Sequence, residues 1–218
     1  HERFDRWHRP NQRGPEEKGW RTTAQRLNLN RDYMKAEAPE MRAMLRLLGD
    51  WDPILYADLH VTDGAKFRHD LSVQVEPLLG WDGDLARVGR ALQDEVLGRL
   101  EQSGFLSVSF YPSFVTADQP ESGFQVAVSP PRYSTGYWAS RNRLGVLVET
   151  HSWKPYARRV QATLTTILAL TEIAARDAGN WLALARKVDS QSASLGGRAL
   201  SLAWANTDEV EMIDFLGY

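Results

Sequence analysis

The chain has 218 residues, of which 43% are hydrophobic and 25% are charged, and its formal net charge is −2. This composition is typical of a globular domain that is large enough to bury a core. A net charge this close to zero gives no electrostatic reason to expect nucleic acid or an anionic membrane as a partner. The chain has no cysteine, which excludes thiol nucleophiles, disulfides and thiolate metal ligands. No apolar run reaches the roughly 18 residues that a membrane-spanning helix needs.

The first third of the chain predicts a loop, a helix and a strand. Residues 1–19 are polar and rich in Arg, Pro and Gly, which predicts a long surface loop. The segment 38–51 (APEMRAMLRLLGDW) has apolar residues at helical spacing, and we expect a helix that begins near Pro39 and stops at Gly49. Residues 52–60 (DPILYADLH) form a short apolar run behind a proline, as in a buried strand.

The rest of the chain continues this alternation. Residues 81–104 predict an amphipathic helix, and 134–142 predict a short one. Residues 105–111 and 124–129 have the pattern of strands joined by a turn. The apolar run 143–150 (RLGVLVET) predicts a strand that ends at Glu149, and 154–179 predict a long amphipathic helix. Five apolar side chains of that helix are expected to face inward: Val160, Leu164, Ile167, Leu168 and Ile173.

Strands that alternate with helices predict an α/β domain with a mostly parallel, mixed sheet sandwiched between helices. We assign this domain to residues 1–189. From about residue 190 the pattern changes to short alternating runs without a long helix. We therefore expect residues 190–218 to be the start of a β-rich appendage.

Polar residues close two of the predicted strands, His60 in DLHVTDG and Glu149 in VLVETHS. Ligands of open α/β sheets bind beyond the carboxyl ends of the strands. A neutral imidazole there is a candidate zinc ligand, or a structural histidine held by hydrogen bonds. A carboxylate there is costly unless it is solvated, paired or functional. Glu149 is therefore either the ion-pair partner of an arginine or a general base that faces a metal across a cleft.

Four stretches, in this order along the chain, resemble the zinc carboxypeptidases of the carboxypeptidase A type: RTTAQRLNLNRDY, DLHVTDG, YSTGYW and GVLVETHS. The opening HERF…NQRGPEEKGWR is similar to a bacterial subgroup of these peptidases. The resemblance implies a carboxypeptidase-like fold and a hydrolase that releases C-terminal residues from peptides. It also implies that zinc is the cofactor and that the protein is periplasmic or secreted.

The resemblance also implies a role for each matching residue. His60 would be a zinc ligand, and Glu149 the general base that takes a proton from the zinc-bound water. Arg21 would face the oxyanion that develops on the scissile carbonyl.

The same resemblance predicts how the substrate is held. Asn30 and Arg31 would clamp the free C-terminal carboxylate of a peptide, because a planar carboxylate suits the guanidinium fork. Tyr137 or Tyr133 would close over the substrate, and Tyr137 is preferred because it sits in the Gly-containing segment STGYW.

One motif of the family is missing. Its first two zinc ligands come from an H-x-x-E motif upstream of the Asn-Arg pair, and these 218 residues contain no such motif. We expect the chain to be truncated before it, because one histidine cannot replace three protein ligands.

Three alternatives stay open. One is a catalytically inactive module of the same fold that binds peptides or cell-wall fragments. Another is a zinc amidohydrolase or deacylase of small N-acyl amino acids. The third, a serine hydrolase with Ser134 or Ser152 and His151, is disfavoured because no G-x-S-x-G motif is present.

Overall fold

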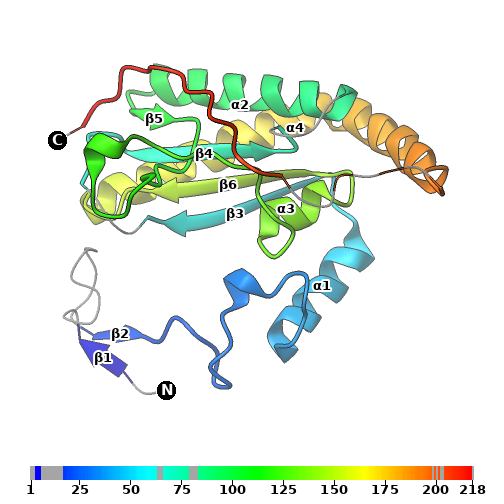
Figure 1. Ribbon diagram of the computed structural model, residues 1–218, viewed down its shortest axis with the longest axis horizontal. Coiled ribbons are helices and arrows are strands. Elements are labelled where there is room, and N and C mark those ends of the chain that lie inside the picture. The colour runs from blue at the N-terminus through cyan, green and yellow to red at the C-terminus, as the bar shows by residue number, and fades with distance from the viewer. Residues whose placement is uncertain are drawn as a thin grey trace.

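A four-stranded mixed sheet forms the centre of the computed structural model, with helices on both of its faces (Figure 1). The structure describes residues 3–5, 17–62, 66–78, 83–197, 199, 201 and 204–217. The strand order is β3-β6-β4-β5, where the strands are β3 (Leu55–Val61), β6 (Leu144–Thr150), β4 (Leu71–Glu76) and β5 (Ser107–Val108). β3 is parallel to β6, β6 is antiparallel to β4, and β4 is parallel to β5. The α/β fold with a mostly parallel, mixed sheet is confirmed.

One face of the sheet is apolar and carries the two long helices, α2 (Asp84–Gln102) and α4 (Tyr156–Ala193). Side chains alternate between the two faces of a strand. In β4, Leu71, Val73 and Val75 therefore join the core under these helices. Ser72 and Glu76 lie on the opposite face, where the short helix α3 (Ser134–Ala139) packs.

The N-terminal part of the chain lies below the sheet in Figure 1 and has its own small core. It contains β1 (Arg3–Asp5), β2 (Glu17–Gly19), the 3-10 turn η2 (Leu29–Arg31) and α1 (Pro39–Trp51). β1 and β2 pair in an antiparallel ribbon, so the loop predicted for residues 1–19 is wrong over these two segments. Tyr33 and Met41 pack with Trp138 of α3 and so attach this part to the sheet.

Two helices, α1 and α4, extend beyond the ends predicted for them. α1 passes through Gly49 and ends at Trp51, where Asp52 adopts a left-handed conformation with a φ of 40°. α4 continues well past residue 179 to Ala193. The described residues after Ala193 form no strand, and the proposed division at residue 190 stays a prediction.

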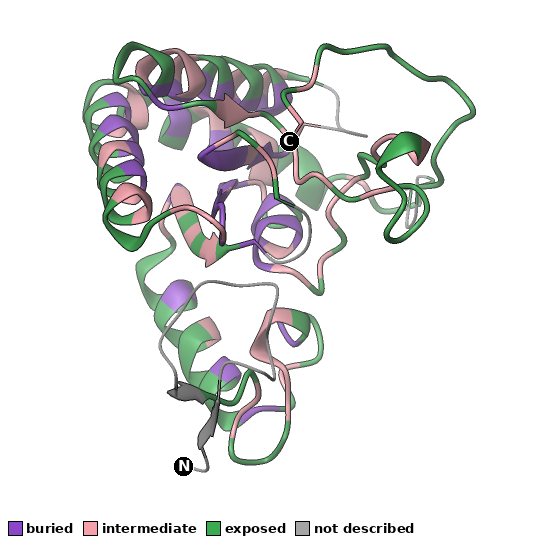
Figure 2. Cartoon of the chain, turned by 90° about the vertical axis from the view of Figure 1, so that its left-hand side faces the viewer, coloured by how far each residue is buried: buried purple, intermediate pink, exposed green. Residues whose placement is uncertain are grey.

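The predicted inward face of α4 is wrong except for Ile173. Val160, Leu164, Ile167 and Leu168 are all more than a third exposed. The buried side of α4 combines small and large residues: Ala162, Thr166, Ala169, Leu170 and Ile173. The alternation of buried and exposed residues along both long helices is visible in Figure 2. Ala162 and Ala169 let the helix backbone approach the sheet closely, while Leu170 and Ile173 fill the core beside them.

The strand predictions were wrong in two places. The central strand β4 was not predicted at all, although LSVQVE alternates between apolar and polar residues. Residues 124–129 form no strand and contribute only the isolated bridge between Phe114 and Phe124. No helix in the described part of the chain is long and apolar enough to cross a membrane.

Candidate active site

The two strand-end residues singled out in the sequence, His60 and Glu149, are neighbours in the sheet. They are register partners in the parallel strands β3 and β6, and Glu149 is also the partner of Ser72 in β4. Partners in register lie on the same face, here the polar face that α3 partly covers. The carboxyl ends of β3 and β6 thus bring an imidazole and a buried carboxylate together.

His60 is held by a carboxylate two residues earlier on the same face. Its Nε2 lies 2.9 Å from Oδ2 of Asp58, and Ser134 at the start of α3 donates to the same oxygen over 2.5 Å. The hydrogen bond to Asp58 raises the pKa of His60, and the charges of Asp58 and Glu149 add to this effect. Burial opposes the increase, and so does the charge of Arg21. Because Nε2 of His60 contacts Asp58, Nδ1 is the ring nitrogen that could bind a further ligand.

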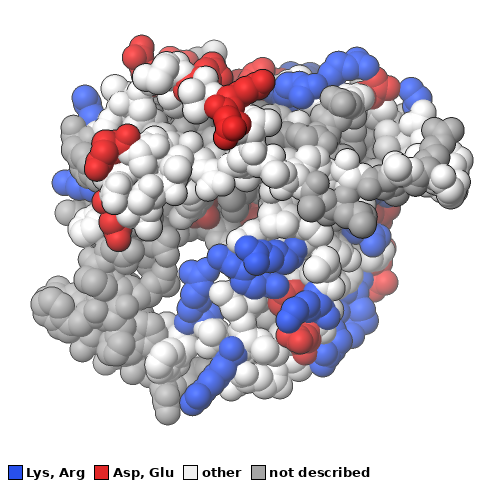
Figure 3. Space-filling view, viewed as in Figure 1, with Lys and Arg blue, Asp and Glu red and all other residues white. Residues whose placement is uncertain are grey.

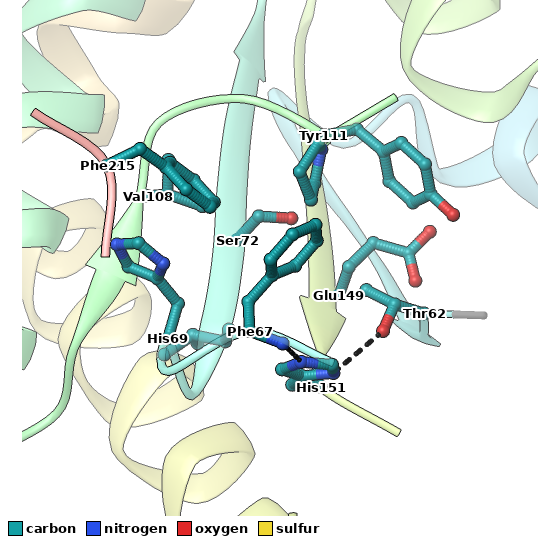
Figure 4. A pocket seen from close by; sticks show the side chains of 11 residues that line it. Thr62, Phe67, His69, Ser72, Val108, Tyr111, Glu149, His151 and Phe215 are labelled. Atoms are coloured by element: carbon teal, nitrogen blue, oxygen red, sulfur yellow. Dashed lines mark hydrogen bonds between the residues drawn. The ribbon is translucent and has the colours of Figure 1, made fainter. Parts of the chain in front are cut away.

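Glu149 is buried at 7% exposure and borders a small, mainly apolar cavity (Figure 4). The cavity volume is about 20 Å³, enough for about one water molecule. Thr62, Ser72 and Tyr111 supply polar atoms to its lining. A carboxylate beside a space for one water has the arrangement that a general base needs.

His151 is a structural residue of the strand end. It is 4% exposed, and its Nε2 accepts a hydrogen bond of 2.6 Å from the backbone N–H of Phe67. Its Nδ1 lies 3.4 Å from Oγ1 of Thr62. Burial lowers the pKa of His151 to about 4, and the charges of Lys154 and His69 act in the same direction. The neutral imidazole therefore ties the loop that precedes β4 to the end of β6.

These contacts argue against the serine hydrolase. Ser134 donates to Asp58 and not to a histidine. His151 contacts Phe67 and Thr62, while the backbone N–H of Ser152 donates to Oγ1 of Thr62. A serine nucleophile needs a histidine base within hydrogen-bond reach, whereas in the described part of the chain the Ser134 hydroxyl donates to a carboxylate.

The two predicted site arginines, catalytic Arg21 and substrate-binding Arg31, lie on the N-terminal part of the chain. Arg21 is exposed, and its charge acts on the pKa of His60, which places it near the strand ends. Arg31 is exposed in η2, and its guanidinium lies 4.5 Å from the ring centroid of Tyr133. Figure 3 shows that Lys and Arg side chains gather over this part of the molecule on the face viewed. The surroundings of the candidate site are thus basic, which suits an anionic ligand.

Arg31 could instead pair with Asp32 or Glu37 on the surface, but among the described residues it forms no ion pair with either. Asp32 accepts hydrogen bonds from the backbone N–H groups of Glu37 and Ala38 at the start of α1. Glu37 lies 3.7 Å from Lys35. No ion pair of Arg31 is present among the residues that the structure describes. Its guanidinium donates one hydrogen bond to the carbonyl oxygen of Asn30. Its other N–H groups can donate to solvent or to a ligand.

Asn30 and Tyr137, the other residues predicted to bind substrate, both lie near the N-terminal core. Asn30 sits in η2, where its backbone N–H donates to Oδ1 of Asn28. Tyr137 is half-buried, with its ring centroid 5.8 Å from that of Tyr33, so in this structure it packs against the N-terminal core. Substrate binding by either residue stays a prediction.

Sequence reasoning named Ser134 only as a possible nucleophile, did not pair Asp58 with His60, and missed Ser72 as a member of the site. Asp58 had a usable signal, because residues two apart on a strand share a face and Asp58 precedes His60 by two. Ser72 and Ser134 had none, because they reach the site through the pairing of β4 with β6 and the packing of α3.

Comparisons of the chain with protein-family models, with curated proteins and with solved structures found no match. Within the described ranges, no group of three or more His, Asp or Glu side chains is placed so that it could hold a metal ion. Zinc needs three protein ligands in a catalytic site. The described residues therefore do not form a complete zinc site by themselves.

Proposed function

We propose that this chain carries the general base and the substrate clamp of a carboxypeptidase-type hydrolase that releases C-terminal residues from peptides. The observation that carries the proposal is the buried Glu149 in register with His60 at the carboxyl ends of two parallel strands. The resemblance in four ordered stretches supports the same class.

Glu149 would act on a water molecule. Its carboxylate lines a largely apolar cavity with room for about one water molecule. It would take a proton from the attacking water and pass it to the leaving amine. Arg21 would stabilise the negative charge that develops on the carbonyl oxygen.

The substrate would be a peptide with a free C-terminal carboxylate. Arg31 would bind that carboxylate, with Asn30 as a neighbouring donor. The exposed position of Arg31 and the absence of an ion pair within the described residues support this role. Tyr137 would have to leave its packing against Tyr33 to cover a substrate.

Zinc would supply a Lewis acid that polarises the scissile carbonyl. His60 is the residue of this chain that we propose as a ligand, since a carboxylate on one ring nitrogen orients the other toward a metal. The remaining ligands would have to come from polypeptide outside the described residues.

The test is peptide hydrolysis by the longest polypeptide that the gene encodes, with the released amino acids identified by mass spectrometry. We expect Glu149→Gln to lower kcat by about a hundredfold or more. Exposed Glu121 offers a matched control, and Glu121→Gln should behave like wild type. Zinc content measured on the same samples should be about one per molecule. Wild-type protein without zinc and without hydrolysis would overturn the assignment.

A second candidate is a peptide-binding module of the same fold. The incomplete set of metal ligands within the described residues favours it. Such a module should bind a peptide with a free C-terminal carboxylate more tightly than the same peptide with a C-terminal amide, and cleave neither. A zinc amidohydrolase would instead cleave small N-acyl amino acids in preference to longer peptides.

A further inference from the structure

A mostly exposed segment, residues 204–217, is anchored to the sheet by one aromatic side chain, Phe215. Val210 and Met212 in this segment are 89% and 93% exposed, whereas Phe215 is partly buried. Between this segment and the rest of the described chain, the backbone hydrogen bond present is that from Arg68 N–H to the Leu216 carbonyl, long at 3.4 Å. The Phe215 ring therefore contributes to the attachment of the segment.

The ring of Phe215 is surrounded by aromatic side chains from other parts of the chain, a cluster that we call the nest: Phe67, His69, Phe110 and Phe124. Its centroid is 4.5 Å from that of Phe124, 4.6 Å from that of His69 and 5.1 Å from that of Phe67. The ring of Phe67 meets it edge-on at 90°, and Phe110 lies 6.3 Å away. These separations and tilts are the ones that aromatic pairs favour. The nest is specific for a flat, aromatic group.

The nest opens onto the cavity of the candidate active site. Phe215, Phe67 and His69 line the same cavity as Glu149 and Ser72. Figure 4 shows the Phe67 ring between Phe215 on one side and Glu149 on the other. An aromatic group in the position of Phe215 would therefore sit one ring away from the buried carboxylate.

We propose that this nest is a binding site for an aromatic side chain of a peptide ligand, and that Phe215 is its internal occupant. The ligand ring and residues 204–217 would then compete for the same place. The chemistry of the nest defines the ligand, because rings and an imidazole surround the position. Binding of a ring needs no reaction at Glu149, so the inference does not rest on the proposed hydrolysis.

The first test removes the occupant in the full chain with Phe215→Ala. The ligand to add is N-acetyl-phenylalaninamide, with N-acetyl-alaninamide as the matched compound without a ring, and binding is followed by chemical shifts in NMR. We expect the variant to bind the aromatic compound at least tenfold more tightly than wild type, and not to bind the alanine compound. Met212→Ala, in the exposed part of the same segment, should behave like wild type. A folded Phe215→Ala protein that binds neither compound, or both equally, would overturn the proposal.

A second measurement needs no destabilising variant. Wild-type protein labelled with 4-fluorophenylalanine gives a fluorine resonance for Phe215, which Phe215→Leu identifies by its loss. Near saturation with N-acetyl-phenylalaninamide, this resonance should move toward the position of a solvent-exposed ring. The alanine compound should not move it. If the resonance stays in place with both compounds, no competition exists. Both measurements follow ring binding and not peptide cleavage, so a failure here is distinguishable from a failure of the proposed hydrolysis.

Discussion

The imidazole of His60 and the carboxylate of Asp58 lie two residues apart on one face of β3 and are joined through Nε2 and Oδ2 at 2.9 Å. Ser134 fixes the same carboxylate from α3. Burial favours the neutral form of Asp58, but its hydrogen bond and charge interaction with His60 outweigh this and hold its pKa below the usual value. The pair therefore sets the orientation of the ring, with Nε2 as the nitrogen that contacts Asp58.

Removing this carboxylate should lower the pKa of His60. In Asp58→Asn the ring loses its main charged partner, while burial, which opposes protonation, remains. We expect an NMR titration to give a lower pKa for His60 in this variant than in wild type. Ser134→Ala keeps the carboxylate and should leave the pKa of His60 raised. Equal values in wild type and Asp58→Asn would show that Asp58 does not control the ring.

Arg31 should recognise the carboxylate of a peptide ligand. Losing a hydrogen bond to a charged group costs about 1.5–3 kcal/mol, so Arg31→Ala should weaken binding by about ten- to a hundredfold. Exposed Arg46 on α1 offers a matched loss of charge, and Arg46→Ala should change little. Calorimetric titration with a peptide and with its C-terminal amide checks this. The clamp is wrong if Arg31→Ala weakens binding of the amide as much as that of the acid.

The protein should lose stability as the pH falls from about 6.5 toward 4, in part through His151. The folded state holds the pKa of His151 at about 4, whereas an unfolded chain binds a proton near pH 6.5. Only the unfolded state gains that proton within this window, so protonation favours unfolding there and has no effect above it. At about 1.4 kcal/mol per pKa unit, the contribution is at most about 3 kcal/mol.

Urea unfolding of wild type and His151→Gln at pH 7.5 and pH 4.5 measures this contribution. The variant should lose less stability between the two values than wild type, because it has no imidazole to protonate. Asp70, whose pKa is also lowered in the fold, contributes an acid-dependent loss to both proteins and cancels in the comparison. An identical loss in both proteins would assign the effect to other groups.

Two glycines of α2 should respond in opposite directions to alanine. A Cβ atom at Gly89 would lie 2.6 Å from the backbone oxygen of Pro77, which is part of the main chain and cannot simply move aside. Gly89→Ala should destabilise the protein by about 1–3 kcal/mol. Nothing lies within 4 Å of a Cβ at Gly98, so Gly98→Ala should stabilise the helix by about 0.5–1 kcal/mol. Thermal unfolding of both variants tests the packing of α2 against the end of β4, and two shifts of the same sign would contradict it.

The sequence alone located much of the secondary structure, because the signals there are local. Residues 81–104 and 143–150 predicted α2 and β6 to within a few residues, from helical periodicity and from an apolar run. The polar ends of β3 and β6 were also readable, since His60 and Glu149 each follow apolar residues. The alternation in LSVQVE was an available signal for β4 that was not used.

Only the tertiary structure decided which of these elements are neighbours. That His60, Glu149 and Ser72 share one row follows from the pairing of β3, β6 and β4, which no local pattern specifies. The orientation of α4 also depended on its surroundings. Both sides of that helix are apolar, and the side that packs in the core carries Ala162, Ala169, Leu170 and Ile173. Periodicity reports what a residue and its near neighbours prefer, whereas a site joins residues far apart in the chain, and their contacts arise only when the core packs.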